Sequence, residues 1–286
     1  ILHNRSIFFS SDDEVKHFFE KRSIENSKKH QQPATLNVKS NLDKLTLNDM
    51  QVFRFNFRHE KNQKILYLHG GYNTLQPSPF HWRLLDKLTL NTLHEVVLPI
   101  YPKSPDYHYL ETFKAIRDVY NQLVEEVGAN NIVMMGDGSG GGLALSFVQS
   151  LINDNQEVPR KLFLLSPLLD ATLTNPNITK TLEENDILVS RFGVHQLMKS
   201  WTNDLPLSDA RISPLYGTLK GLPPIYMYGG GREILSPDMH AFTHALEECG
   251  NDVEFKEYPK MVHDFPIYPI RQSHKVLKHI TKSILE

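Results

Sequence analysis

The chain has 286 residues, of which 40% are hydrophobic and 22% are charged, and its formal net charge is −2. This length and composition suit a globular chain with a large core and exclude the collagen-like, disordered and disulfide-scaffold classes. The near balance of charge gives no sign of binding to nucleic acid or to an anionic membrane. The single cysteine, Cys249, excludes an intrachain disulfide and a multi-cysteine metal site.

The sequence has no run of about 18 apolar residues, so no transmembrane helix is predicted. One cysteine and no visible signal suit the cytoplasm. The sequence begins at Ile1 rather than at a methionine, which leaves an upstream signal or anchor open, and the oligomeric state is open as well.

The N-terminal part is polar, and apolar residues at positions 15–19 are spaced for one amphipathic helix. We expect residues 1–32 to form an N-terminal cap segment. Phe53, Phe55 and Phe57 then alternate with polar residues, which predicts a strand with one buried face.

From there apolar runs alternate with helical segments. The runs read as strands buried on both faces, and they lie at 65–68, 96–98, 132–135, 162–165 and 225–228. A helix is predicted from about Tyr109 to Val127, and another after Gly142, because their apolar residues recur at helical spacing. Such alternation predicts an α/β fold, with a mostly parallel central sheet and helices on both faces.

Residues 171–213 break this alternation, because they are helical and loop-like and carry no strand signal. We expect them to form a cap inserted into a catalytic domain of residues 33–286.

Ten of the fifteen glycines stand in three clusters, and each cluster follows a predicted strand. In open parallel sheets, ligands bind at the carboxyl ends of the strands. In the first cluster Gly70 and Gly71 follow His69, and two successive glycines let backbone amides approach a ligand. A plain strand-to-loop turn is an equally good interpretation.

The second cluster runs from Gly136 to Gly142 and contains Ser139. It matches the dinucleotide fingerprint G-x-G-x-x-G, but the next predicted strand ends in Ser166 and Pro167 rather than in an acid, so nucleotide binding is the weaker interpretation. Two others remain. The cluster is either a helix start capped by Ser139 or a nucleophile elbow, a serine on a sharp strand-to-helix turn.

The third cluster leads to Glu233 and to Asp238, which opens the next predicted helix and is expected to cap it. His263 follows a further strand-like run, Val253-Glu254-Phe255. Serine, then an acid, then histidine is the chain order of a hydrolase triad.

Together these residues resemble the hormone-sensitive-lipase-like family of α/β-hydrolases, bacterial carboxylesterases with a helical cap. The matching segments are His69-Gly70-Gly71, Pro99-Ile100-Tyr101-Pro102, Gly136-Asp137, Gly140-Gly141, Ile212-Ser213-Pro214 and His263-Asp264-Phe265. The resemblance implies the α/β-hydrolase fold and hydrolysis of small acyl esters through a Ser-His-acid triad, with no cofactor and no metal. The partner it implies is a small ester substrate.

By the same resemblance, His263 is the general base and Glu233, where the family has an aspartate, orients it. The backbone amides of Gly70, Gly71 and Gly140 are expected to stabilise the oxyanion.

One departure concerns the elbow, which in the family is Gly-Asp-Ser-Ala-Gly-Gly. When this motif is aligned with the chain without gaps, its nucleophilic serine aligns with Gly138 and its alanine aligns with Ser139. Either Gly138 takes the positive φ of the elbow and no nucleophile is in place, or the turn shifts by one residue and Ser139 attacks. We predict Ser139 as the nucleophile; a water molecule could use the same pocket. The alternative function is a catalytically silent protein that binds a small ligand or a partner.

Other candidates carry weaker signals. His240 and His244 have a metal-binding spacing, but a solvated helix face explains them better. Trp82, Trp201 and Phe192 are candidates for the acyl pocket or the cap interior, although burial by itself would explain them. Cys249 is expected to be a small buried residue.

Overall fold

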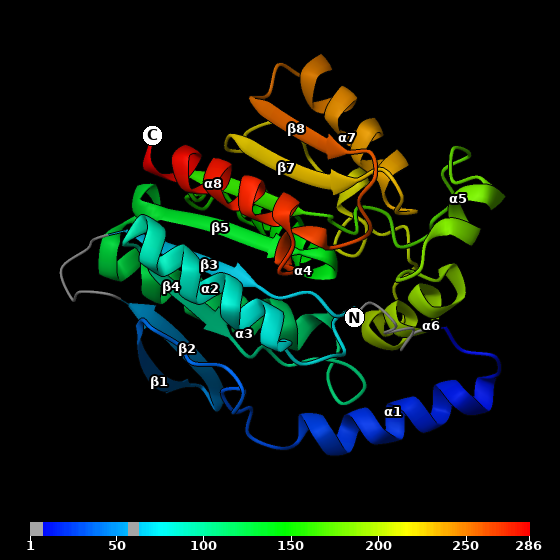
Figure 1. Cartoon of the computed structure of the whole chain (residues 1–286), viewed down its shortest axis with the longest axis horizontal. Helices are drawn as coiled ribbons and strands as arrows, with labels where there is room; N and C mark the ends of the chain where they lie inside the picture. The colour runs from blue at the N-terminus through cyan, green and yellow to red at the C-terminus, as the bar shows by residue number, and fades with distance from the viewer. Residues whose placement is uncertain (1–7, 57–62) are drawn as a thin grey trace.

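The computed structural model describes residues 8–56 and 63–286. Its centre is an eight-stranded sheet with the strand order β1-β2-β4-β3-β5-β6-β7-β8 (Figure 1). The strands are β1 (Asn41–Leu47), β2 (Met50–Asn56), β3 (Lys64–Leu68), β4 (Glu95–Pro99), β5 (Ile132–Asp137), β6 (Lys161–Leu165), β7 (Ile225–Gly230) and β8 (Val253–Tyr258). Only the pairs β1–β2 and β2–β4 are antiparallel, so the predicted mostly parallel sheet is confirmed.

Helices cover both faces of this sheet. The longer ones are α2 (Pro79–Thr92), α3 (Tyr109–Val127), α4 (Gly138–Asn153), α7 (Ser236–Glu248) and α8 (Arg271–Leu285). In Figure 1, α2 and α8 lie in front of the sheet, where their apolar residues form one buried cluster with the strands. Helices α3, α4 and α7 contribute to the cluster on the opposite face. The helix predicted over residues 109–127 is α3.

Strand β3 shows why the two clusters form. All of its residues are buried, and alternate side chains face opposite sides of the sheet. Ile65 and Tyr67 join the cluster of α2 and α8, whereas Leu66 and Leu68 join the other cluster. A continuous apolar run is therefore the expected signature of such a strand.

Strand β2 carries Phe53 and Phe55, which are buried against Trp82 of α2. Trp82 is therefore a core residue, which corrects its candidacy for an acyl pocket. Phe57, the third member of the predicted alternation, lies outside the described residues.

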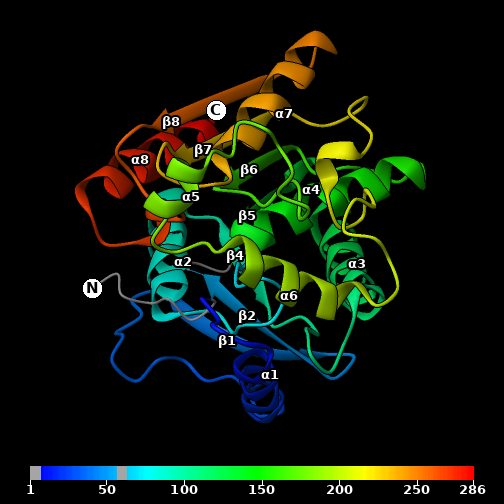
Figure 2. The same ribbon diagram turned by 90° about the vertical axis from the view of Figure 1, so that its right-hand side faces the viewer.

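Three further helices lie beyond the carboxyl ends of the parallel strands: α1 (Asp12–Asn26), α5 (Lys180–Asn185) and α6 (Arg191–Thr202). Figure 2 looks onto this end, with α5 and α6 in front of the sheet and α1 below them. Short 3₁₀ turns occur at Ala129–Asn131, Pro214–Tyr216 and Phe265–Ile267. Within residues 8–56 and 63–286, no helix is long and apolar enough to cross a membrane.

Candidate active site

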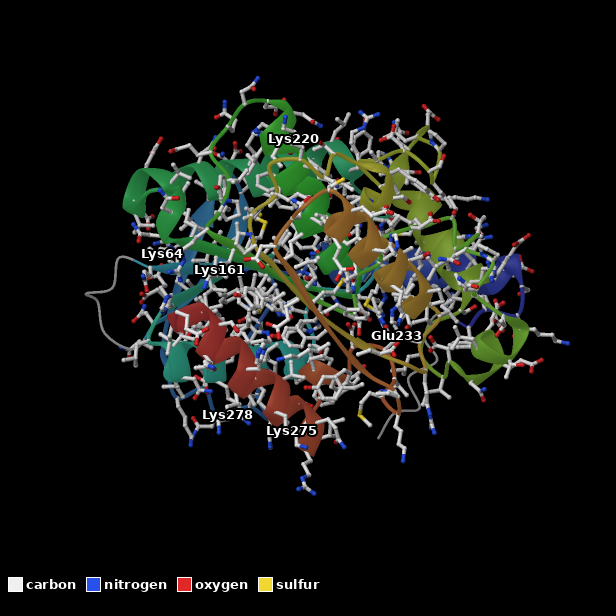
Figure 3. The ribbon with its side chains drawn as sticks, turned by 90° about the horizontal axis from the view of Figure 1, so that it is seen from above. Lys64, Lys161, Lys220, Glu233, Lys275 and Lys278 are labelled. Carbon is white, nitrogen blue, oxygen red and sulfur yellow. The ribbon has the colours of Figure 1, made fainter. Side chains whose placement is uncertain are left out.

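The predicted acid and histidine meet at the carboxyl ends of the last two strands. Glu233 follows β7, His263 follows β8, and Nδ1 of His263 lies 2.7 Å from Oε2 of Glu233. The other carboxylate oxygen of Glu233 accepts hydrogen bonds from Ser166 Oγ at 2.8 Å and from the N–H of Gly230 at 2.5 Å. Glu233 is thus held in one orientation. Figure 3 shows it at the opposite end of the sheet from Lys161, which begins β6.

His263 also touches a second carboxylate. Its Nε2 lies 3.1 Å from Oδ2 of Asp264, the next residue in the chain. Burial lowers the pKa of His263, but Asp264 and Glu233 more than offset this and raise the pKa well above its usual value. Both ring nitrogens of His263 thus face a carboxylate, Nδ1 that of Glu233 and Nε2 that of Asp264.

The turn between β5 and α4 places residue 138, not residue 139, opposite His263. Gly138 has a φ of +51°, which glycine adopts without steric cost. A Cβ built on Gly138 would stand 3.4 Å from Nε2 of His263 and 3.1 Å from Oδ2 of Asp264. The apex of the elbow is therefore Gly138, which corrects the prediction of a turn shifted by one residue.

Ser139 lies in the first turn of α4 and has no positive φ. It is 4% exposed, and its Oγ accepts a hydrogen bond from the N–H of Asn73 at 3.3 Å. The structure thus brings Ser139 to the loop after β3, and it does not bring Ser139 to His263. Its role as a nucleophile stays a prediction.

The two predicted oxyanion glycines of the first cluster differ. The N–H of Gly70 donates to Oδ1 of Asp137 at 3.0 Å, so it is not free for an oxyanion, and this part of the prediction is wrong. Within the described part of the chain, no acceptor contacts the N–H of Gly71. Gly71 stays a candidate donor.

The oxyanion donor at the start of α4 also differs from the predicted one, Gly140. In a nucleophile elbow, this amide belongs to the residue after the apex, which is Ser139 when Gly138 is the apex. Gly140 has a packing role, because a Cβ there would stand only 2.2 Å from the carbonyl oxygen of Leu68 in β3. That close approach sets the start of α4 against the end of β3.

Asp137, which sequence reasoning matched to the elbow but gave no role, joins the elbow to the loop after β3. Besides the N–H of Gly70, it accepts the hydroxyl of Tyr67 at 2.6 Å and contacts Nε2 of His81 at 2.9 Å. Burial raises the pKa of Asp137, but His81 and the other donors outweigh burial and lower it. The ionised carboxylate of Asp137 therefore holds the elbow and the loop after β3 together.

A pocket opens beside the elbow, on the side of α6. It is lined by Asn73, Ser139, Gly142, Leu143, Leu168, Met198, Trp201, Arg211 and Ile212. Of the aromatic candidates, Trp201 lies in this lining, whereas the side chain of Phe192 is 42% exposed.

The remaining candidates lie on the surface. His240 contacts Glu257 at 3.0 Å and His244 contacts Glu248 at 3.4 Å, so each histidine has its own carboxylate partner. Cys249 is exposed, which corrects the expectation that it is buried.

Comparison with known proteins gives a consistent result. Residues 65–267 match a family model described as alpha/beta hydrolase fold. An esterase from Acinetobacter venetianus is 34% identical over 208 residues, which are 72% of this chain and 68% of that protein. A triacylglycerol lipase from Mycobacterium tuberculosis is 29% identical over 77% of this chain and 46% of its own length.

Solved structures agree. A crystal structure from Staphylococcus aureus, of a protein assigned as an esterase, is 64% identical, with a TM-score of 0.98 over 100% of this chain and 97% of that one. An esterase of the bacterial hormone-sensitive lipase family shares the fold with a TM-score of 0.84 at 20% identity, over 99% of this chain and 94% of that one.

Proposed function

Because this chain belongs to the α/β-hydrolase fold family, we propose that it hydrolyses carboxylic esters at the site of His263 and Glu233. The observation that carries the proposal is the 2.7 Å contact between Nδ1 of His263 and Glu233, which fixes the ring with Nε2 toward the elbow. The relatives named esterase and lipase support the same class of reaction.

Small acyl esters are the substrates in this proposal. Leu143, Met198 and Trp201 supply apolar surface for an acyl chain, and Asn73 supplies a polar rim. The N-terminal segment with α1 and the segment 171–213 with α5 and α6 form the cap in this proposal, and α6 supplies the lining residues Met198 and Trp201. The carbonyl oxygen of the ester would lie against the N–H groups of Gly71 and Ser139, which stabilise negative charge as it develops.

The attacking group is a water molecule in this proposal. Gly138 brings no hydroxyl to the position opposite His263, which leaves a water molecule as the group that attacks there. Ser139 is the second candidate, because its hydroxyl lines the same pocket. The two differ in one respect that can be measured, since only attack by Ser139 forms an acyl-enzyme.

Two assays test the proposal. The purified chain should hydrolyse p-nitrophenyl acetate or butyrate, and His263→Ala should remove most of that activity. Incubation with a fluorophosphonate probe, followed by intact-mass measurement, should give no adduct. An adduct that maps to Ser139 and disappears in Ser139→Ala would establish the serine as nucleophile.

A catalytically silent binding protein is the remaining candidate, and the glycine at position 138 is the observation in its favour. No turnover of any short-chain ester, together with no adduct, would support it and would overturn the proposal of hydrolysis.

A further inference from the structure

Asp264 combines three features that each cost free energy. Its φ is +53°, in a region that non-glycine residues seldom occupy. The residue is only 9% exposed, and its Oδ1 is buried with no hydrogen-bond partner among the described residues. Backbone strain and an unpaired buried polar atom persist in a fold mainly where they serve a function.

The surroundings of Asp264 hold this carboxylate at the elbow. Its N–H donates to Oγ of Ser166 at 3.1 Å, and the same hydroxyl donates to Glu233. Its Oδ2 lies 3.1 Å from Nε2 of His263 and 3.1 Å from the point where a Cβ of Gly138 would stand. The carboxylate therefore lies where a side chain at residue 138 would meet the histidine.

Several charged and titratable groups face Asp264 from different elements. They are Tyr67 of β3, Tyr72 of the following loop, His81 of α2, Asp137 at the end of β5, Glu233 after β7, and His263 and Tyr268 of its own loop. Burial, together with the negative charges of Asp137 and Glu233, raises the pKa of Asp264 to about 6, although His263 acts in the opposite direction. A carboxyl group with this pKa is ionised at neutral pH and basic enough to accept a proton from water.

We propose that Asp264 is a catalytic residue, the general base that activates the attacking water, and that protonated His263 is the general acid. This inference rests on the proposed ester hydrolysis. It deepens that function by assigning to a carboxylate next to the histidine the proton transfer that a serine hydrolase performs with the histidine alone.

The proton and bond changes balance. The water oxygen bonds to the ester carbonyl carbon as one of its protons passes to a carboxylate oxygen of Asp264, and the carbonyl oxygen becomes the oxyanion. The tetrahedral intermediate then expels the alcohol: the C–O bond breaks, and Nε2 of His263 gives its proton to the leaving oxygen. The proton on Asp264 passes across the 3.1 Å contact to His263, which restores both groups.

The decisive experiment compares Asp264→Asn with the wild-type chain on p-nitrophenyl butyrate. A lost general base should lower kcat by about 10²- to 10⁴-fold with little change in KM. The wild-type rate should fall below about pH 6 as Asp264 becomes protonated, and this acid limb should be absent from the residual rate of the variant.

Asp238→Asn is the matched control, because Asp238 is also a buried carboxyl with a pKa of about 6 but contacts Asn175 rather than His263. It should keep wild-type kcat and the acid limb. Circular dichroism of each variant reports on folding. Independently of any variant, wild-type enzyme should release p-nitrophenol without a pre-steady-state burst, because no acyl-enzyme forms.

The outcomes separate the two proposals. No hydrolysis by the wild type overturns the proposed function itself. Hydrolysis with a burst, or with unchanged kcat in folded Asp264→Asn, overturns the role of Asp264 and leaves ester hydrolysis standing. If Asp264→Asn does not fold, the wild-type burst and pH profile alone decide the question.

Discussion

At the residue scale, the chemistry depends on which side chain follows Asp137. A left-handed apex suits glycine, and Gly138 occupies it, so the only hydroxyl of the elbow, that of Ser139, faces the pocket and the N–H of Asn73. The histidine at the site contacts two carboxylates, those of Glu233 and Asp264.

Placing a hydroxyl at residue 138 tests whether this residue is the apex that faces His263. In Gly138→Ser combined with Asp264→Gly, the new side chain points at Nε2 of His263, and removal of the carboxylate relieves the 3.1 Å approach. We expect fluorophosphonate labelling at residue 138, with a loss of stability of about 1–3 kcal/mol from the strained φ. Peptide mass spectrometry locates the adduct.

Adding Ser139→Ala to that double variant should leave the labelling intact. Labelling that moves to Ser139, or that depends on it, would contradict the assignment of residue 138 as the apex.

A second residue-scale prediction concerns Glu233→Gln. The amide keeps the shape of the acid but removes a negative charge from His263, so the pKa of the histidine should fall. We expect kcat at pH 8 to fall about 10- to 100-fold and the alkaline limb of the pH–kcat profile to move to lower pH. Glu247→Gln, an exposed change on α7, serves as the control and should leave the profile in place. An unmoved alkaline limb would contradict the coupling.

At the scale of elements, the inserted segment is fastened to the active-site loop by Asp186, between α5 and α6. Its Oδ1 accepts the N–H groups of Leu188 and Val189, both at 2.9 Å, and its Oδ2 accepts the N–H of Ile234 at 2.9 Å. Ile234 directly follows Glu233, so one buried carboxylate links the insertion to the residue that orients the histidine.

Asp186→Ala should therefore affect both stability and catalysis. Three buried N–H groups lose their acceptor, and we expect the free energy of unfolding in urea to fall by about 3 kcal/mol and KM to rise. The control is Asp204→Ala, an exposed change in the same inserted segment, which should alter neither quantity. Equal effects of the two variants would show that Asp186 does not fasten the insertion.

The same scale shows what sequence patterns predict well. Strands buried on both faces, such as β3 and β5, appear as unbroken apolar runs, and α3 appears as one apolar stripe. Strand β1 escaped prediction because it lies at the edge of the sheet and is largely exposed, so its residues show no apolar alternation.

At the scale of the whole molecule, buried carboxyl groups link stability to pH. Burial raises the pKa of Asp238 to about 6, above its value of about 4 in an unfolded chain. Between these values the folded state binds more protons than the unfolded state, so this group makes stability fall as pH rises from about 4 to about 6.

Asp238→Asn should remove that contribution. Across this pH interval, the free energy of unfolding of the wild type should fall by about 3 kcal/mol relative to the variant. Urea unfolding at several pH values measures the difference, and Asp154→Asn, a surface change, is the control. Parallel curves for wild type and Asp238→Asn would contradict the prediction.

By itself, the sequence determined the family, the mostly parallel sheet and the pairing of Glu233 with His263. The periodicity of apolar residues and the chain order of the acid and the histidine are visible without coordinates. Only the tertiary structure decided which residue faces the histidine. The direction of a side chain at the elbow depends on the φ of residue 138, and next to it Gly140 packs closely against Leu68 of β3, which is distant in the chain. The position of Asp264 likewise depends on a segment distant in the chain, because its N–H donates to Ser166.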